Sequence, residues 1–176
     1  MDKQLLKKSY KLDNMEIIAY SELSDKEKEL ILIWRNDDRI RKWSFNNKLI
    51  SDDEHKCFLN NLKINYNKAY WLVKNNDGTY MGVFNLSEFD SKNNSAYLGT
   101  ALNPDNLGQG KGKYIMNCIE YIGFKVLKLE KLLLVVLKNN TRAVKFYKNM
   151  NYKEIDELNF INHNKSSVYK LIKYNP

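Results

Sequence analysis

Three of the chain's seven glycines, Gly108, Gly110 and Gly112, stand at alternate positions near the middle of the sequence. The apolar stretch before them, residues 95–102, has the character of a strand, and the stretch after them, 114–127, has that of a helix. Glycine permits positive φ and close approach, so backbone N–H groups of such a loop can converge on an anion at the helix N-terminus. Strand, glycine loop and helix in this order predict a phosphate-binding turn in an α/β fold.

Two common phosphate loops do not fit this segment. A P-loop ends in Lys followed by Ser or Thr, whereas Lys113 is followed by Tyr114. A dinucleotide-binding loop lies near the start of a βαβ unit with an acidic residue about 20 positions later, and this loop is central in the chain. Taken alone, the loop is equally well explained by a turn that only tightens the connection from strand to helix.

A second motif, residues 140–152, follows the next buried strand. Asn140 can cap a helix or bond an amide-containing ligand, Ala143 removes bulk one turn later, and Tyr147 lies one further turn along the same face. One helix face therefore carries an amide-binding group, a gap and a hydroxyl. This second motif favours ligand binding over a merely tight turn at the glycine loop.

The remaining pattern predicts one domain over residues 1–176, since a chain of this length fits a single core. Ser24 with Glu27 and Ser51 with Glu54 have the spacing of capping boxes, and they predict helices over about 25–35 and from about 52 to 64. A further helix, the fourth, is expected over 141–150. Strands are expected over 16–20, 69–73, 80–86, 95–102, 132–137, 152–160 and 166–174.

Composition narrows the class of protein. The start of the chain has no apolar signal-like region, and no uncharged stretch is long enough to span a membrane, so a cytoplasmic location without membrane contact is expected. Cys57 and Cys118 lack metal or disulfide spacing and are expected to be buried free thiols, and no metal is expected. The formal charge of +8 comes from scattered Lys residues, which favours a solvated surface first, phosphate-bearing small molecules second and nucleic acid third.

The two motifs together resemble the GNAT superfamily of acetyl-CoA-dependent N-acetyltransferases. Residues 107–112 are similar to its pyrophosphate loop and residues 140–152 to its Asn-x-x-Ala-x-x-x-Tyr-x-x-x-Gly segment, although Leu107 replaces Arg or Gln and Asn151 replaces Gly. The resemblance implies an α/β (α+β) fold with a mixed, mostly antiparallel sheet of about six to seven strands flanked by helices. It also implies acetyl-CoA as co-substrate, bound by Leu102, Asn103, Gly108, Gln109, Gly110, Lys111, Gly112, Lys113, Asn140, Ala143 and Phe146.

Shorter segments resemble bacterial enzymes of pseudaminic acid synthesis, which N-acetylate a UDP-linked 4-amino-4,6-dideoxy sugar. These segments are 34–36, 55–58, 80–83, 97–99 and 103–104. The resemblance implies that Arg35 and His55 face the nucleotide diphosphate. It also implies an acceptor pocket formed with Trp43, Phe45, Phe58 and Tyr97. Purely structural explanations of these residues also stay open. The aromatic residues can belong to the core, His55 can cap its helix, and Arg35 can only complement the helix dipole.

Direct attack of an amine on the thioester is the expected mechanism, because neither cysteine has a paired His with Asp or Asn. Tyr147 is the expected general acid for the departing thiolate, and an N–H near Leu102 is expected to bind the carbonyl oxygen. Glu88 is the one carboxylate proposed as base, and the alternatives are a chain of water molecules as base and a Glu88 that is only solvated. Alternatives left open are a ribosomal-protein N-terminal or antibiotic N-acetyltransferase and a non-enzymatic nucleotide-binding module; a homodimer is also left open.

Overall fold

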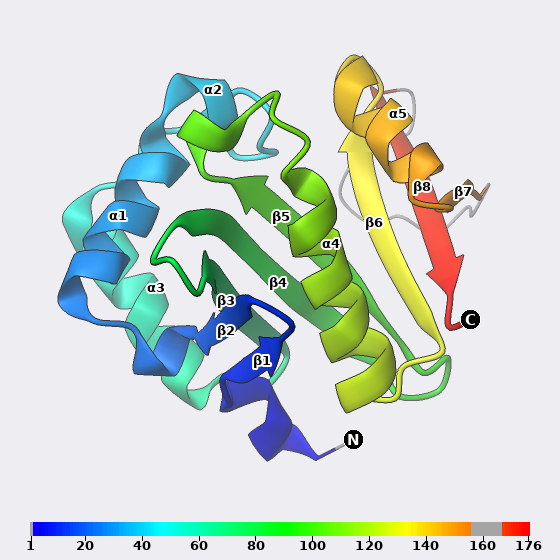
Figure 1. Cartoon of the computed structure of the whole chain (residues 1–176), viewed down its shortest axis with the longest axis horizontal. Helices are drawn as coiled ribbons and strands as arrows, with labels where there is room; N and C mark the ends of the chain where they lie inside the picture. Colours follow the sequence, from blue (N-terminus) through cyan, green and yellow to red (C-terminus); the bar gives the residue numbers. More distant parts are fainter. Residues whose placement is uncertain (1, 156–166) are drawn as a thin grey trace.

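The computed structural model describes residues 2–155 and 167–176. Its described strands form one eight-stranded sheet in the order β1-β2-β3-β4-β5-β6-β8-β7 (Figure 1). All neighbouring strands are antiparallel except β5 and β6, which are parallel. The strands are β1 (Tyr10–Leu12), β2 (Met15–Ala19), β3 (Lys68–Asn75), β4 (Tyr80–Asp90), β5 (Ser95–Leu102), β6 (Lys131–Leu137), β7 (Lys153–Glu154) and β8 (Val168–Tyr174).

Both predicted capping boxes are present and begin helices of the structure. Ser24 and Glu27 exchange hydrogen bonds at the start of α1 (Asp25–Asn36), and Ser51 and Glu54 do so at the start of α3 (Asp52–Ile64). The other helical segments are η1 (Lys3–Lys7), η2 (Tyr20–Glu22), α2 (Asp38–Arg41), η3 (Pro104–Asn106), α4 (Gly112–Glu120), the π-helical η4 (Tyr121–Val126) and α5 (Thr141–Asn149).

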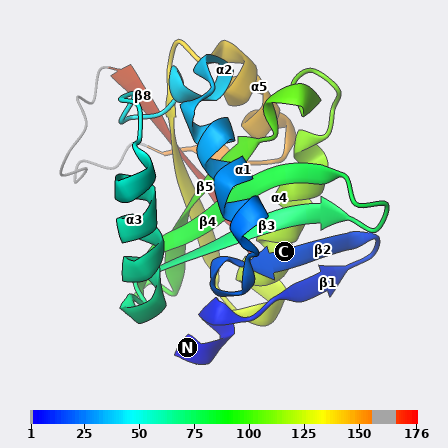
Figure 2. The same cartoon turned by 90° about the vertical axis from the view of Figure 1, so that its left-hand side faces the viewer.

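Helices cover the two faces of the sheet and enclose two apolar clusters. The larger cluster lies between the sheet and α4 and includes Trp71, Phe84 and Ile119, each almost fully buried. The smaller cluster lies under α1 and α3 and includes Ile31, Trp34 and Leu72. Figure 1 shows α4 and α5 on one face, and Figure 2 shows α1 and α3 in front of the sheet. We call these the α4/α5 face and the α1/α3 face.

The fold agrees with the predicted class and differs in detail. Strand β1 was not expected, because three residues are too few for the alternation that identifies a strand. The helix expected over 114–127 is α4 followed by η4, whose π-helical turns the sequence pattern does not distinguish. Of the strand expected over 152–160, β7 is the described part, and residues 156–160 lie outside the described residues. Cys118 is buried as expected, whereas Cys57 is exposed on α3, so that half of the cysteine prediction is wrong.

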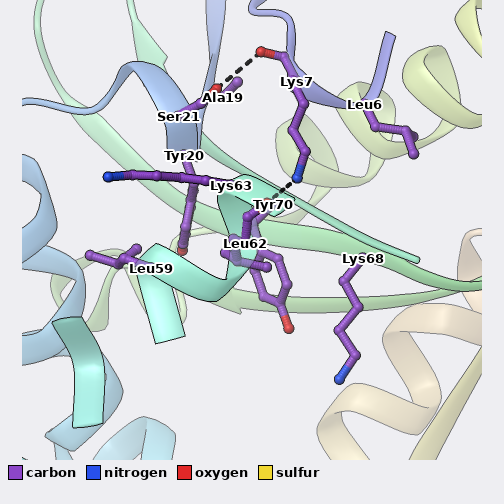
Figure 3. Close-up of a pocket in the computed structure, with 10 residues that line it drawn as sticks. All are labelled: Leu6, Lys7, Ala19, Tyr20, Ser21, Leu59, Leu62, Lys63, Lys68 and Tyr70. Carbon is purple, nitrogen blue, oxygen red and sulfur yellow. Dashed lines mark hydrogen bonds between the residues drawn. The ribbon is translucent and has the colours of Figure 1, made fainter. Parts of the chain in front are cut away.

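A small cavity of about 20 Å³ lies between α3, the N-terminal segment and β3. It is lined by Leu6, Leu59, Leu62 and the rings of Tyr20 and Tyr70, among others (Figure 3). A space of this size holds a single water, so it is no candidate for a ligand site. Among the described residues, no helix is long and apolar enough to cross a membrane.

Candidate active site

The parallel strands β5 and β6 pair at one end only. Their register contains three pairs, which end at Tyr97 opposite Leu133, although β5 continues to Leu102 and β6 to Leu137. Figure 1 shows the two strands diverging beyond that point. We call the unpaired region between them the wedge, and its closed end the apex. Beyond Tyr97 and Leu133 these two strands have no further register pairs, so the wedge leaves backbone groups of β5 and β6 unpaired with each other.

Backbone N–H groups of β5 point into the wedge. The Asn103 N–H donates to the Met81 carbonyl at 2.9 Å, so Asn103 faces β4. Successive residues of a strand direct their N–H groups to opposite sides, so those of Thr100 and Leu102 point away from β4, toward β6. The predicted donor near Leu102 is therefore placed where a ligand in the wedge would meet it.

The glycine loop provides further free donors at the start of α4. Gly108 and Gly110 have φ of 86° and 72°, which is the left-handed region that glycine tolerates best. Within the described residues, the N–H groups of Gly108, Gly110, Lys111 and Gly112 have no hydrogen-bond acceptor, and α4 has no side-chain cap. Backbone donors and a helix N-terminus together suit a pyrophosphate, so the loop fits the nucleotide half of acetyl-CoA.

Polar side chains beside the loop serve mainly to hold its shape. Asn103 caps η3 and donates to the Tyr80 carbonyl at 3.1 Å, and Gln109 donates to the Asp105 carbonyl at 2.7 Å. Lys111 donates to the Asn106 side chain at 3.0 Å. These contacts explain Asn103, Gln109 and Lys111 as structural parts of the loop, and their predicted contacts with CoA remain predictions.

Helix α5 lies directly against the loop. A Cβ on Gly112 would come within 3.1 Å of Phe146 Cζ, so the ring of Phe146 packs on the glycine. Asn140 caps α5 by accepting from the Ala143 N–H at 3.2 Å. The two motifs that are separated in the sequence are therefore neighbours in the fold. The helix ends at Asn149, and Asn151 beyond its C-cap has a φ of 64°, the left-handed geometry expected of the Asn that replaces the family's Gly.

Tyr147 is half-buried on α5, beside the rings of Phe146 and Tyr152. Burial raises the pKa of Tyr147 to about 12. The phenol is therefore protonated at any ordinary pH and can donate a hydrogen bond. Full transfer of its proton to a thiolate, whose conjugate acid has a pKa near ~8.5, is unfavourable, so the structure favours hydrogen-bond donation over proton donation.

Glu88 is exposed on β4, next to the Ser87–Tyr97 pair that lies at the level of the apex. Its φ of 53° is unusual for a residue with a side chain, and its N–H donates to the Asn67 carbonyl at 3.1 Å. The strand register is irregular between Ser87 and Asp90 at this point. Glu88 is accessible and near the level of the apex, and its role as base stays a prediction.

A row of side chains crosses the α1/α3 face toward the apex. Tyr70 of β3 pairs with Asn85 of β4, which pairs with Gly99 of β5. Alternation puts Tyr97 on this face as well, because Ala96 and Leu98 are buried in the cluster on the other side. Tyr97 lies 5.5 Å from Lys170 Nζ, measured to the ring centroid. Tyr70 and Asn85 are candidate acceptor contacts that the sequence reasoning missed.

Arg35 and Asn36 hold the segment 42–50 against α1. Arg35 donates to Ser44 Oγ at 2.7 Å and to the Asn46 carbonyl at 2.9 Å. The Asn36 amide donates to the Ile50 carbonyl and accepts from the Ile50 N–H. This acceptor-side loop, as we call residues 42–50, exposes Trp43 and Phe45 by 39% and 50%. Two large aromatic side chains left half in water suit contact with a ligand better than a core role.

The other two predicted acceptor residues lie deeper. His55 is only 7% exposed, and its Nε2 lies 3.0 Å from the Lys28 carbonyl of α1. Burial lowers the pKa of His55, which disfavours the cation that would bind a phosphate. Phe58 packs edge-on against Tyr70 at 5.2 Å. The structure thus brings together Arg35, Trp43, Phe45, Phe58 and Tyr97 on one face and leaves His55 between two helices.

Comparison with known proteins finds relatives in sequence and in structure. A model of the acetyltransferase (GNAT) family matches residues 34–152. A curated relative, Acetyltransferase PseH of Campylobacter jejuni, is 33% identical over 138 residues, which are 78% of this chain and 84% of the relative. The crystal structure of C. jejuni N-acetyltransferase PseH in complex with acetyl coenzyme A has a TM-score of 0.72 and 28% identity, and the match covers 92% of this chain and 99% of that chain.

A more distant structure shows the fold alone. Spermidine N-acetyltransferase from Vibrio cholerae, in complex with CoA and spermine, has a TM-score of 0.80 at 22% identity. The match covers 93% of this chain and 97% of that chain. The overall fold is therefore shared with a protein whose sequence has diverged widely.

Proposed function

The chain belongs to the acetyltransferase (GNAT) family and is an N-acetyltransferase that uses acetyl-CoA, and from this premise we propose that its acceptor is a UDP-linked 4-amino-4,6-dideoxy sugar. The observation that carries the proposal is the similarity to the relatives named PseH over 78% of the chain. The short segments that resemble enzymes of pseudaminic acid synthesis support the same acceptor. We also propose that the enzyme acts in the cytoplasm, as the sequence pattern predicts.

The donor half of the site is assigned to the α4/α5 face. The free N–H groups of Gly108, Gly110, Lys111 and Gly112 bind the pyrophosphate, and the pantetheine arm enters the wedge along β5. There the N–H groups of Thr100 and Leu102 are available to its amides and to the thioester carbonyl. Donors fixed in a strand need no reorganisation when charge develops on the carbonyl oxygen.

The acceptor half is assigned to the α1/α3 face. The sheet is open between β5 and β6 beyond the apex, so a thioester in the wedge can be reached from this face. The exposed parts of the Trp43 and Phe45 rings would stack on the uracil or the sugar. Arg35 supports this surface by holding the acceptor-side loop, and its remaining N–H groups carry the predicted contact with the diphosphate.

The transfer is a direct attack. The lone pair of the neutral amine forms a bond to the thioester carbon, and the C–S bond then breaks with its electron pair on sulfur. Tyr147 donates a hydrogen bond to that sulfur. The proton lost by the amine passes to Glu88 or water and finally to the thiolate, so the products are an N-acetyl sugar and CoA-SH.

Competition by UDP tests the acceptor assignment. UDP lacks the amine but keeps the base and the diphosphate, so it is expected to compete with the acceptor and not with acetyl-CoA. Arg35→Lys keeps the charge and loses the fork that holds two oxygens of the loop, so it is expected to weaken UDP inhibition. Absence of competition by UDP in the wild type contradicts the nucleotide-sugar assignment.

A further inference from the structure

Gly99 lies inside strand β5. A glycine inside a strand lowers stability, because it has no side chain to pack and because it increases the backbone entropy of the unfolded chain. Its φ is not in the left-handed region, so the backbone does not require glycine there. A Cβ at this position would lie 2.5 Å from Asn85 Oδ1, 3.4 Å from Asn85 Cγ and 3.6 Å from Asn85 Nδ2. The three atoms nearest to such a Cβ all belong to Asn85, so the absence of a side chain at Gly99 makes room for this amide.

The Asn85 amide lies over Gly99 without a partner. Asn85 is half-buried on β4, and its side chain has no hydrogen bond to any residue that the structure describes. A half-buried amide without a partner loses hydration and gains nothing within the chain. The nearby Thr100 side chain, by contrast, donates to the Val83 carbonyl at 3.1 Å. The Asn85 amide therefore differs from Thr100 in being available to hydrogen-bond a ligand.

The position of this amide is close to where the amine must attack. The ladder between β5 and β6 ends at Tyr97, and Gly99 is two residues further along β5, just inside the wedge. Asn85 lies on the α1/α3 face, from which the acceptor reaches the wedge, and Tyr70 follows it in the same row. A side-chain oxygen here is placed to accept a hydrogen bond from an amine that approaches the thioester.

We propose that Asn85, held over Gly99, binds the acceptor amine and orients it for attack. Asn85 Oδ1 accepts one N–H bond of the amine, which directs the nitrogen lone pair at the thioester carbon. The bond strengthens as the nitrogen becomes positively charged, and no proton moves to the amide. Asn85 is therefore a catalytic residue by contact with the reacting nitrogen, and Gly99 is its positioning residue. This inference rests on the proposed acetyl transfer but not on the identity of the sugar.

The test is a double-mutant cycle with Asn85→Ala, Gly99→Ala and the double variant. A hydrogen bond to a developing charge contributes enough that Asn85→Ala is expected to lower kcat/KM for the acceptor by about 10- to 100-fold, with the Kd for acetyl-CoA unchanged. Gly99→Ala displaces the amide and is expected to have a similar effect in the wild-type background. In the Asn85→Ala background the three atoms nearest to the new methyl group are absent, so the second change is expected to add nothing.

Asn85→Asp distinguishes the contribution of the amide oxygen from that of the amide N–H group. Asp keeps the accepting oxygen and loses the N–H donor, so it is expected to retain more activity than Asn85→Ala; a loss as large as that of Ala would overturn the role of Oδ1. Wild-type kinetics in Asn85→Ala, or equal effects of Gly99→Ala in both backgrounds, would overturn the proposal. If the wild type acetylates another primary amine and not the UDP sugar, the acceptor assignment fails, and the same cycle is then run with that amine.

Discussion

Substitution of Tyr147 by Phe tests the leaving-group interaction. The phenol has a pKa raised to about 12 by burial, against ~8.5 for a thiol, so proton transfer to the thiolate is uphill by about 5 kcal/mol. A hydrogen bond to the charged sulfur remains, and such bonds are worth about 1.5–3 kcal/mol. Tyr147→Phe is therefore expected to lower kcat about 10- to 100-fold, at the low end of general acid catalysis, with little change in KM for acetyl-CoA.

The assay is single-turnover acetyl transfer followed by mass spectrometry, so that chemistry and not product release is measured. Phe keeps the ring contacts with Phe146 and Tyr152, and an unchanged Tm serves as the control for folding. An unchanged single-turnover rate removes Tyr147 from the mechanism. Because the raised pKa keeps the phenol protonated up to about pH 11, a falling limb near pH 9 that disappears in the Phe variant refutes the burial argument.

Three further variants test other parts of the structure. Gly110→Val forces a β-branched residue to a φ of 72° and is expected to weaken CoA binding about tenfold or more in calorimetry. Gly110→Asn is the control and is expected to lose less affinity, because Asn tolerates this geometry. Equal affinity of the Val variant and the wild type for CoA contradicts the loop assignment. Burial lowers the pKa of His55, so as pH drops below about 6.5 the unfolded chain binds a proton before the folded chain does, and the free energy of unfolding falls. His55→Gln is expected to reduce this fall, measured by urea titrations at several pH values. If the free energy of unfolding depends on pH in the same way in the variant, the prediction is contradicted. Lys7 donates to the Leu62 and Asn65 carbonyls at the end of α3, so Lys7→Met is expected to lower the free energy of unfolding by about 1 kcal/mol and Tm by about 2–4 °C. Lys3 is exposed, and Lys3→Met, the control, is expected to change Tm little. Equal Tm values for the two variants contradict this capping role.

Local rules identify those parts of the fold whose causes are local. The capping boxes at Ser24 and Ser51 involve residues three positions apart, and both are present. The left-handed Asn151 and the cap at Asn140 also depend on a few neighbouring residues. These features could be predicted because the residue and its partner lie in one short segment.

Partners far apart in the chain decide what the sequence could not show. His55 and Arg35 both stand near a helix end in the sequence. In the fold, the His55 imidazole is buried against the Lys28 carbonyl, and the Arg35 guanidinium donates to Ser44 and to the Asn46 carbonyl. The separation of β5 from β6 has no residue signature, since both strands are mostly apolar along their length. Gly99 did carry a signal, because a glycine inside a strand indicates close approach, but its partner Asn85 depends on strand register.

The most direct test of the account is the product itself. The purified protein is incubated with acetyl-CoA and a UDP-linked 4-amino-4,6-dideoxy sugar, and the sugar is analysed by mass spectrometry and NMR. The account predicts gain of one acetyl group at the 4-amino nitrogen, with release of one CoA-SH for each sugar converted. Acetylation of a peptide N-terminus or an aminoglycoside, with the UDP sugar left unmodified, would contradict it.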